Sequence, residues 1–499
     1  MTEQQPTPID DDLPEQMRIR RHKREELLES DTPPYPRGFS RTHTLDEVRA
    51  TYPDLEPGTE TGDRVAVAGR VIFLRNTGKL CFARIREGSG SELQIMLSLD
   101  RVGEARLQDW KHVVDIGDLI GVAGDVVSSK RGELSVAAQT WVIVSKALRP
   151  LPVAHKALNE ETRIRQRYVD LIVNPEARDM VRTRATVVRS LRETLHDHGY
   201  LEVETPVLQT VHGGAAARPF ETHLNAFDLS MTLRIALELY LKRAIVGGVD
   251  KVYEIGRIFR NEGVDSTHSP EFTMLEAYEA YGDYDTMAAL TRELVLGAAR
   301  SVGRTVVSDG KGAEIDLEAP WVRVTLHEAV ANVVGEDVTI DTSTQRLREL
   351  AAKHDVEVQP GWGHGEIVLE LFEKLVEHTI TTPTFVCDYP ESVRPLARPH
   401  RDDPRLVEAW DLIIAGVELA PAYSELVDPV VQRARLEAQS LLAAAGDPEA
   451  MQVDEDFLRA LEYGMPPTGG MGLGVDRLVM LLTGAGIRET ILFPLVKPE

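Results

Sequence analysis

The chain has 499 residues, of which 42% are hydrophobic and 27% are charged. This length corresponds to about two to four domains, and the composition excludes a mainly disordered chain. No run of about 18 apolar residues is present to span a membrane, and the acidic N-terminus lacks the apolar core of a signal peptide. The two cysteines, Cys81 and Cys387, lie far apart, which excludes a disulfide scaffold or a cysteine-rich zinc site. A cytoplasmic protein without a membrane partner is therefore expected.

The charge is unevenly distributed. The whole chain carries −24, which argues against a nonspecific nucleic-acid binder. Residues 64–149 hold 13 basic and 9 acidic side chains, a net +4, whereas residues 151–499 sum to −21. The stretch MRIRRHKR (17–24) adds five basic side chains. This pattern is compatible either with ordinary solvated surfaces or with a nucleic-acid-binding front on an enzyme for a cationic substrate.

The N-terminal part, residues 1–62, is predicted to be a disordered tail followed by a helix that begins near Met17. Short runs rich in β-branched residues then alternate with turns, with one helical piece at 104–114. The pattern predicts a closed barrel of the OB type over residues 63–150, with an SH3-like barrel as the alternative. The five predicted strands are 65–74, 79–87, 92–99, 117–129 and 133–147.

Residues 151–175 are predicted to form a helical linker, beginning at RPLP (149–152). The second domain, 176–499, starts with a long helix ended by Gly199 and a strand that stops at Pro206. The helices and hairpin-like strands that follow predict an α+β domain around a mostly antiparallel sheet. Weaker patterning at about 302–360 indicates an insertion.

The segment KVYEIGRIFRNEGVDSTHSPEFTMLEAYEAY (251–281) is predicted to be two strands joined by a polar loop. Because side chains alternate along a strand, Arg260 and Glu262 share one face, and Phe272, Glu276 and Tyr278 share one face. Burying an unpaired charge costs on the order of several kcal/mol, so this face is expected to line a polar pocket. An arginine beside an aromatic ring suits a nucleotide, since one pairs with phosphate and the other stacks on the base. A solvated amphipathic hairpin is the alternative.

Two carboxylates are predicted to converge in WDLIIAGVELAPAYSEL (410–426). A two-residue turn at Ala415–Gly416 places Ile413 opposite Glu418, with Asp411 as the diagonal neighbour on the same face. Two such carboxylates need a compensating cation, and oxygen ligands suit Mg²⁺ on nucleotide phosphates. A pair of carboxylates at a solvated sheet edge is the alternative.

The segment GMPPTGGMGLGVDRLVMLL (464–482) places glycines at 470, 472 and 474 before a helix that contains Asp476 and Arg477. Too few residues follow this helix to complete the βαβ unit of a dinucleotide-binding domain. The glycines do allow a flat ligand to approach the backbone. A tight strand–helix junction is the alternative.

Together these segments resemble the three motifs of class II aminoacyl-tRNA synthetases. YLEVETPVL with Pro206 is similar to motif 1, FRNEG with His268 and Phe272 to motif 2, and GMGLGVDR to motif 3. GGAAARPF (213–220), ELYLKR (238–243), PEFTMLEAY (270–278) and AYSEL (422–426) resemble the bacterial lysyl-tRNA synthetases. The resemblance extends over nearly the whole chain, including the barrel.

The resemblance implies activation of L-lysine by ATP, with lysyl transfer to the 3′ end of tRNA-Lys, and it implies roles for individual residues. Arg260 and Arg477 are the implied catalytic residues, and Asp411 and Glu418 the implied Mg²⁺ ligands. The implied ATP-binding residues are Arg260, Glu262, His268, Phe272, Gly472 and Arg477. The implied lysine-binding residues are Gly214, Glu238, Glu276, Tyr278, Tyr423 and Glu425. Among these, two carboxylates and a hydroxyl at the ε-ammonium (Glu238, Glu425 and Tyr278) make physical sense for selecting a long cationic side chain.

The same resemblance implies that the barrel binds the anticodon, with Phe82 and Gln94 at the central base, and that the protein is a homodimer. An aromatic side chain in a basic groove is a general means of holding single-stranded RNA. Core packing is the alternative for Phe82, and an ordinary surface strand is the alternative for Gln94.

The sequence departs from the family pattern at four positions. Leu237 replaces a usual proline, Gly256 and Pro421 replace usual asparagines, and Val427 replaces a polar residue. Proline has no N–H to donate, so a hydrogen bond is expected to be lost at Pro421. Two other functions therefore stay open: a paralogue that adenylates lysine or an analogue for an acceptor other than tRNA, and a non-catalytic synthetase-like binder.

Overall fold

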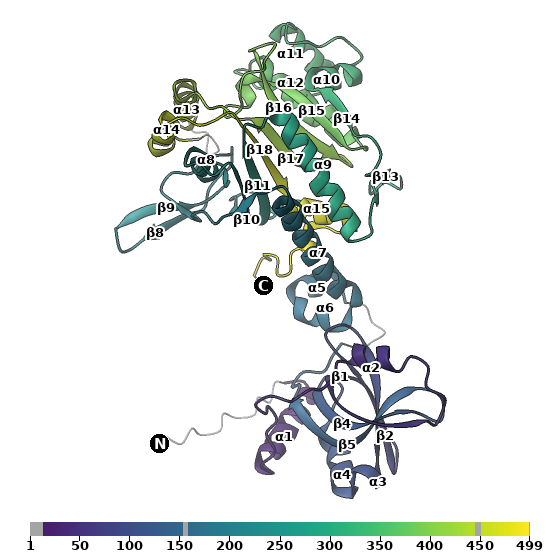
Figure 1. The fold of residues 1–499 in the computed structure, drawn as a ribbon. Coiled ribbons are helices and arrows are strands. Elements are labelled where there is room, and N and C mark those ends of the chain that lie inside the picture. Colours follow the sequence, from purple (N-terminus) through teal and green to yellow (C-terminus); the bar gives the residue numbers. More distant parts are fainter. Residues whose placement is uncertain (1–12, 153–157, 445–450, 499) are drawn as a thin grey trace. The chain divides into compact units, whose positions relative to one another are not determined.

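The computed structural model describes residues 13–152, 158–444 and 451–498, so most of the predicted N-terminal tail lies outside the described residues. The chain separates into two compact units (Figure 1). The first comprises residues 1–159 and 168–175, and the second residues 160–167 and 176–499. Among the described residues, none of the helices has the length and apolarity needed to cross a bilayer.

A closed five-stranded barrel forms the centre of the first unit and confirms the predicted OB-type fold. Its strands are connected in the order β1-β2-β3-β5-β4. Alternate residues such as Cys81, Ala83 and Ile85 point into the core, as the strand periodicity requires. The indole of Trp110 packs edge-on against Trp141, with ring centroids 5.2 Å apart. The strands are β1 (Glu60–Asn76), β2 (Leu80–Arg86), β3 (Glu92–Ser98), β4 (Leu119–Ser128) and β5 (Leu134–Ser145), with short helices α2 (Leu45–Thr51), α3 (Leu99–Val102) and α4 (Glu104–Val113).

The basic N-terminal helix α1 (Glu15–Glu29) is fastened to this barrel. The buried Arg20 donates to the carbonyl oxygens of Ile116 and Ala147, at 2.8 and 3.1 Å. Lys23 Nζ lies 2.7 Å from Asp115 Oδ1. Two of the five basic side chains in the stretch 17–24 therefore hold the helix in place.

The second unit is built on an eight-stranded sheet in the order β14-β15-β16-β17-β18-β11-β10-β6. All neighbouring pairs are antiparallel except β14 with β15 and β10 with β6. This confirms the predicted α+β class with a mostly antiparallel sheet. The strands are β6 (Leu201–Glu202), β10 (Lys251–Phe259), β11 (Glu271–Ala280), β14 (Val322–Thr325), β15 (Thr384–Pro390), β16 (Leu406–Ile414), β17 (Val417–Ser424) and β18 (Thr468–Gly474).

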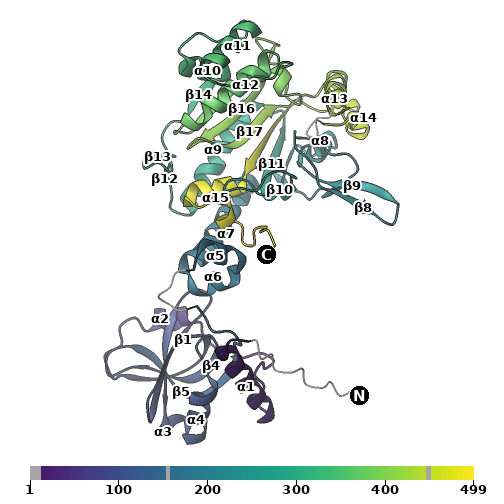
Figure 2. The ribbon, with the colours of Figure 1, turned by 180° about the vertical axis from the view of Figure 1, so that it is seen from behind.

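Helices cover one face of this sheet and flank its ends (Figures 1 and 2). The largest apolar core joins α9 (Tyr284–Ser301) and α15 (Val475–Thr483) to sheet residues such as Trp410, Leu412 and Leu473. Since side chains alternate along β16, the neighbours of these residues, including Asp411, point to the opposite face. That opposite face carries the candidate site. Separate cores lie under α10 (Leu326–Val334), α11 (Thr344–Lys353) and α12 (His364–Leu375), and under α8 (Glu238–Val246), α13 (Pro429–Ala444) and α14 (Glu455–Glu462).

The remaining elements are peripheral to the sheet. The long helix α7 (Pro175–Asp197) ends before Gly199, as predicted. A hairpin made of β8 (Glu221–Leu224) and β9 (Leu229–Leu233) extends from the body of the unit (Figures 1 and 2). The other elements are α5 (Glu160–Arg165), α6 (Arg167–Val173), β7 (Leu208–Gln209), β12 (Val306–Ser308), β13 (Glu314–Asp316), the short turns η1 (Glu377–Thr379) and η2 (Glu391–Val393), and α16 (Ile487–Thr490).

Candidate active site

A cavity of about 390 Å³ opens on the face of the large sheet opposite α9 and α15, between the helices that pack on the two ends of that face. Strands β11, β16, β17 and β18 supply most of its lining, with contributions from the loop before α8 and the loop between β10 and β11. Charged groups are concentrated in it, as expected for a site that binds charged substrates. The predicted site residues that line it are Gly214, Glu238, Arg260, Glu262, His268, Phe272, Glu276, Tyr278, Asp411, Glu418, Tyr423, Gly472 and Arg477.

Strand β11 presents the polar face that its alternation predicts, whereas Arg260 and Glu262, predicted to lie on the first strand, belong to the loop after β10. Phe272, Glu276 and Tyr278 all point from β11 into the cavity, and Arg260 follows the end of β10. The Arg260 guanidinium carbon lies 5.3 Å from the centre of the Phe272 ring. A cation and an aromatic face are therefore adjacent at one end of the cavity, which excludes the solvated-hairpin alternative.

Glu276 lies at the acidic end of the cavity. Its Oε1 accepts a hydrogen bond of 2.9 Å from the backbone N–H of Leu237, and its Oε2 accepts one of 3.0 Å from the Tyr278 hydroxyl. Burial raises the pKa of Glu276 to about 7, against the lowering effect of the Leu237 hydrogen bond. Leu237 stands where the family usually has proline, and it supplies a backbone N–H donor that proline lacks.

Glu425 lies deeper than the cavity lining, bound to a lysine that the sequence analysis did not single out. Lys242 Nζ lies 2.5 Å from Glu425 Oε2 and 2.5 Å from Glu238 Oε1. All three side chains are almost fully buried. The signal for Lys242 was the spacing of four residues from Glu238 in ELYLKR, which puts both on one face of α8. Among the described residues, Glu425 Oε1 has no hydrogen-bond partner.

Gly470 separates Glu425 from the cavity. A Cβ atom on Gly470 would lie 2.0 Å from Glu425 Oε1 and 2.5 Å from Tyr278 Cε1, so no other residue fits there without displacing both. At Gly472 the nearest atoms to such a Cβ are 3.8 Å away. Gly470 therefore leaves room for the Glu425 carboxylate next to the cavity, whereas Gly472 leaves open space above the sheet.

The β16–β17 hairpin has the predicted turn and pairing. Ala415 and Gly416 both have positive φ, at 55° and 73°, and Ile413 pairs with Glu418. The Cα partner of Asp411 is Pro421, because the pairing shifts by one residue between Leu412 and Ile413. Pro421, which stands where the family usually has asparagine, therefore lies directly opposite Asp411, the candidate metal ligand.

Arginines surround the two carboxylates of this hairpin. Arg394, which the sequence analysis missed, donates to Asp411 Oδ2 at 2.5 Å. Arg477 donates to the carbonyl oxygen of Glu418 at 2.7 Å. Desolvation at the cavity wall, and then the Asp411 carboxylate, raise the pKa of Glu418, although its side chain is 41% exposed. Burial, with Glu418 as the next cause, raises the pKa of nearby Glu377 to about 7. This excess of carboxylates fits a divalent cation whose remaining ligands are phosphate oxygens. Within the described ranges, protein side chains alone form no cluster of three or more metal-ligating residues.

Asp476 joins three elements near the end of the cavity that carries Phe272. Its Oδ1 accepts a hydrogen bond of 2.5 Å from Arg184 on α7, and its Oδ2 accepts one of 2.6 Å from the backbone N–H of Thr273. Arg184 also donates to the Thr273 hydroxyl at 2.9 Å. These hydrogen bonds hold Thr273 in place and thereby fix the position of Phe272, the residue before it.

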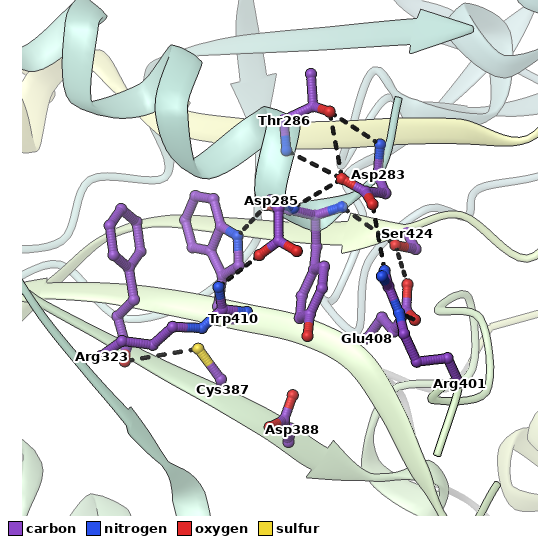
Figure 3. Close-up of polar contacts among 12 residues, drawn as sticks. Asp283, Asp285, Thr286, Arg323, Cys387, Asp388, Arg401, Glu408, Trp410 and Ser424 are labelled. Carbon is purple, nitrogen blue, oxygen red and sulfur yellow. Dashed lines mark hydrogen bonds and ion pairs between the residues drawn. The ribbon is translucent and has the colours of Figure 1, made fainter. Parts of the chain in front are cut away.

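A second network fixes the strand end that carries Glu425 (Figure 3). Ser424 Oγ accepts a hydrogen bond of 3.1 Å from the backbone N–H of Tyr284 and donates one of 2.5 Å to Glu408. Arg401 joins Glu408 to Asp283 through ion pairs of 2.5 and 3.2 Å. Since this network lies on the core side of the sheet, it positions Glu425 without contacting the cavity.

The departure at Gly256 has a local steric reason. A Cβ atom there would lie 2.4 Å from Arg234 Nη2 and 2.9 Å from Glu254 Oε1. These two side chains form a buried ion pair of 2.6 Å that crosses the glycine. An asparagine at this position would have to displace the ion pair.

On the barrel, Phe82 and Gln94 lie on the outer face, so core packing is excluded for Phe82. Gln94 Nε2 donates to Ser135 Oγ at 2.9 Å, and its Cα partner on β2 is Arg84. Phe73 lies on the neighbouring strand opposite Arg84 and is 48% exposed. The alternation of β1 did not reveal Phe73, because a bulge between Val71 and Phe73 turns the side chain outward.

The fold and the site together define a nucleotide-using enzyme of the aminoacyl-tRNA synthetase class, joined to a nucleic-acid-binding barrel. The family of class II tRNA synthetases (D, K and N) matches residues 159–497, and the OB-fold nucleic acid binding domain matches residues 65–144. The chain belongs to this class II tRNA synthetase family, and it is a ligase.

Two relatives are similar along nearly their whole length, and a third over part of its length. The chain is 57% identical over 490 residues to a lysine–tRNA ligase of Mycolicibacterium gilvum and 56% identical over 496 residues to one of Mycobacterium tuberculosis, covering 98% of each protein. It is 50% identical over 492 residues to the lysylphosphatidylglycerol biosynthesis bifunctional protein LysX of Nocardia farcinica. That match covers 97% of this chain but only 43% of LysX.

Proposed function

We propose that this protein is a lysine–tRNA ligase, which activates L-lysine with ATP to lysyl-adenylate and pyrophosphate and then transfers the lysyl group to the 3′ end of tRNA-Lys. The observation that carries the proposal is the division of charge in the cavity. Arg260 and Arg477 lie at the end suited to phosphates, whereas Glu238 and Glu276 line the other end, with Glu425 behind them. The full-length similarity to lysine–tRNA ligases supports the same conclusion.

Lysine binds at the acidic end. Gly214 has φ of +86°, and a Cβ atom there would lie 3.0 Å from that of Glu238, so the loop can approach an amino acid only as glycine. Gly214 and Glu276 receive the α-ammonium, and Glu238, Tyr278 and Glu425 surround the ε-ammonium. Tyr423 closes the side wall. An analogue without the ε-ammonium leaves a buried carboxylate unpaired, which makes its binding weak.

ATP binds at the basic end. The adenine ring stacks on Phe272, while Glu262 and His268 bracket the nucleotide and Gly472 gives the flat ligand access to the sheet. Arg260 holds both the lysine carboxylate and the α-phosphate, so the attacking oxygen and the phosphorus are brought together. Arg477 stabilises charge on the leaving pyrophosphate. No protein nucleophile is needed, since the lysine carboxylate attacks the phosphate directly.

Asp411 and Glu418 are the residues suited to hold Mg²⁺ with ATP. Mg²⁺ supplies neutralisation of the pyrophosphate charge when it is bound. Arg394, which also lines the cavity, orients Asp411, and the raised pKa of Glu418 supports a site that gains stability from an added cation. The backbone of Pro421 cannot donate a hydrogen bond here, so this edge of the site relies on side chains.

The barrel binds the anticodon of tRNA-Lys. Phe82 and Gln94 contact the central base, and exposed Phe73 and Arg84 extend the same surface with a second aromatic ring and a cation. Stacking on such rings contributes about 1–3 kcal/mol per base. This surface favours tRNA over an acceptor of another kind.

We infer further that the enzyme is a cytoplasmic homodimer. An apolar groove of about 580 Å³ lies between α7 and the C-terminal segment, lined by Met180, Val181, Val188 and Leu492. Val181, Leu492 and Phe493 are 39, 40 and 65% exposed, which suits a self-association surface. Both cysteines are free and buried, as in proteins of a reducing compartment. Sedimentation velocity tests the dimer, and a single species of monomer mass would refute it.

The test of function is charging of purified tRNA-Lys with labelled lysine by the isolated protein, with ATP and Mg²⁺. Incorporation into tRNA-Lys, and not into tRNA of another specificity, is expected. Lysine-dependent pyrophosphate exchange without charging would instead indicate a paralogue with another acceptor. A folded protein with neither activity would indicate a non-catalytic binder.

A further inference from the structure

Three carboxylates and one ammonium group form a buried cluster at the acidic end of the cavity. Glu238 and Lys242 come from α8, Glu276 from β11, and Glu425 follows β17. Their side chains are between 0 and 6% exposed. Buried charges of this density must be compensated, because an ion that is neither solvated nor paired is strongly unfavourable in a protein interior.

Lys242 is placed to act on this cluster from behind. Its ammonium group bridges Glu238 Oε1 and Glu425 Oε2 at 2.5 Å each, and it is not among the residues that line the cavity. It cannot contact a ligand there. The free oxygen of each bridged carboxylate is directed elsewhere: Glu238 Oε2 lies close to Gly214, and Glu425 Oε1 lies close to Gly470, both at the cavity wall.

The number of charges in the cluster matches one class of ligand. Fully ionised, the cluster carries three negative charges and one positive charge. The two ammonium groups of a diamino acid bring this total to zero, because its carboxylate is held by Arg260 outside the cluster. An amino acid with one ammonium group leaves one negative charge buried and uncompensated.

We propose that Lys242 is a positioning residue that acts as the internal counter-ion of the amino-acid site: it fixes Glu238 and Glu425 and sets the charge of the empty site so that a diamino acid neutralises it. The proposal rests on the proposed lysine specificity and assigns part of that specificity to a residue that does not touch lysine.

The ionisation behaviour of the cluster supports this assignment. Burial opposes the charge on Lys242, but Glu238 and Glu425 outweigh burial and raise its pKa. Burial raises the pKa of Glu425 to about 8, and Lys242 is the first group that lowers it. The other titratable groups that face the cluster are Tyr278 from β11, Tyr423 from β17 and the more distant guanidinium of Arg260. The empty site therefore holds protons near pH 7, and lysine must displace them.

The test is calorimetry of lysine binding at pH 7 in two buffers of different ionisation enthalpy, which counts the protons released. The variants are Lys242→Met, Lys242→Arg and the double variant Lys242→Met with Glu238→Gln. Lys251→Met is the matched control, since Lys251 forms a 2.8 Å pair with Glu279 on the same sheet outside the cavity. Pyrophosphate-exchange kinetics give KM for lysine and for ATP with the same proteins.

Lys242→Met is expected to release about one proton more than wild type, to weaken lysine binding at least roughly tenfold and to leave KM for ATP within about twofold. Lys242→Arg and the double variant, which restore the total charge, return the proton count to the wild-type value. The double variant replaces a buried ion pair by neutral groups and so covers the case in which Lys242→Met does not fold. Lys251→Met behaves as wild type.

A purely structural role for Lys242 would lower the melting temperature of Lys242→Met and leave its proton count and KM for lysine unchanged. That result would overturn the proposal that Lys242 is the counter-ion of the site. A double variant whose proton count differs from wild type would overturn it as well. Failure of the wild-type protein to bind lysine is a separate outcome, because it refutes the lysine specificity and the counter-ion together before any variant is considered.

Discussion

The substitution Gly470→Ala tests the lysine site with a single methyl group. Its Cβ atom would lie 2.0 Å from Glu425 Oε1 and 2.5 Å from Tyr278 Cε1, whereas ordinary contacts begin at about 3.4 Å. Neither neighbour can move easily. Glu425 is held by Lys242, and both side chains are buried, at 1 and 3% exposure.

The size of the effect follows from this overlap. Overpacking a buried site costs typically about 1–3 kcal/mol, and about 1.4 kcal/mol corresponds to a tenfold change in affinity. Since the methyl group displaces two lysine-binding candidates at once, KM for lysine is expected to rise about 10- to 100-fold. KM for ATP is expected to change less than about twofold, because the overlap lies at the acidic end.

The assay is lysine-dependent pyrophosphate exchange with each substrate varied separately, beside thermal melting. Gly472→Ala is the matched control on the same face of β18, since its Cβ atom would have no neighbour closer than 3.8 Å. It is expected to melt like wild type and to raise KM for ATP but not for lysine. A normal KM for lysine in Gly470→Ala would refute the placement of the ε-ammonium beside Glu425.

The remaining predictions concern protons, the nucleotide and the metal. Burial raises the pKa of Glu276 to about 7 and that of Glu425 to about 8, above the ordinary 4.5, so the folded, ligand-free protein binds more protons than the unfolded chain between about pH 5 and 8. Its stability is expected to fall as pH rises through this window, while lysine affinity rises by up to about tenfold per pH unit for each proton displaced. Asp476→Asn removes the charge that Arg184 and the Thr273 amide share, and it is expected to cost about 2 kcal/mol of stability and to raise KM for ATP. Glu418→Gln is expected to raise the Mg²⁺ concentration for half-maximal exchange about tenfold without weakening lysine binding.

Each of these has a clear contrary result. Calorimetry that finds lysine affinity independent of pH between 5.5 and 8 would contradict the protonated empty site. Urea denaturation of the Asp476 variant should show reduced stability, and an unchanged midpoint would mean that its hydrogen bonds carry no net stabilisation. An unchanged Mg²⁺ requirement in the Glu418 variant would remove that residue from the metal site.

The architecture of the site was largely predictable because its elements are local hairpins. Strand alternation alone groups Phe272, Glu276 and Tyr278, and the Ala415–Gly416 turn alone brings Glu418 into register with Ile413. These arrangements depend on residues close in the chain, where the period of two and the turn type leave little freedom. The alternation pattern could not show that these hairpins belong to one site. The resemblance to class II synthetases predicted this, and the family match confirms the resemblance.

Tertiary structure decided what lies behind those faces. Lys242 and Glu425 are 183 positions apart in the numbering, and no periodicity shows that they form an ion pair. The contacts of Arg394 with Asp411 and of Arg184 with Asp476 are likewise made by side chains from separate elements. Arg20 and Lys23 of the N-terminal helix also bind barrel residues that are distant in the chain.

The sequence by itself thus determined the fold class and the faces of the strands, which follow from patterns repeated at short intervals, and the resemblance to class II synthetases identified most residues that line the cavity. Only the tertiary structure decided how the buried charges are paired, because an ion pair in a core depends on which distant elements pack together. For this protein that difference matters most at the amino-acid site, where the lining carboxylates can be identified from the chain but their counter-ion cannot.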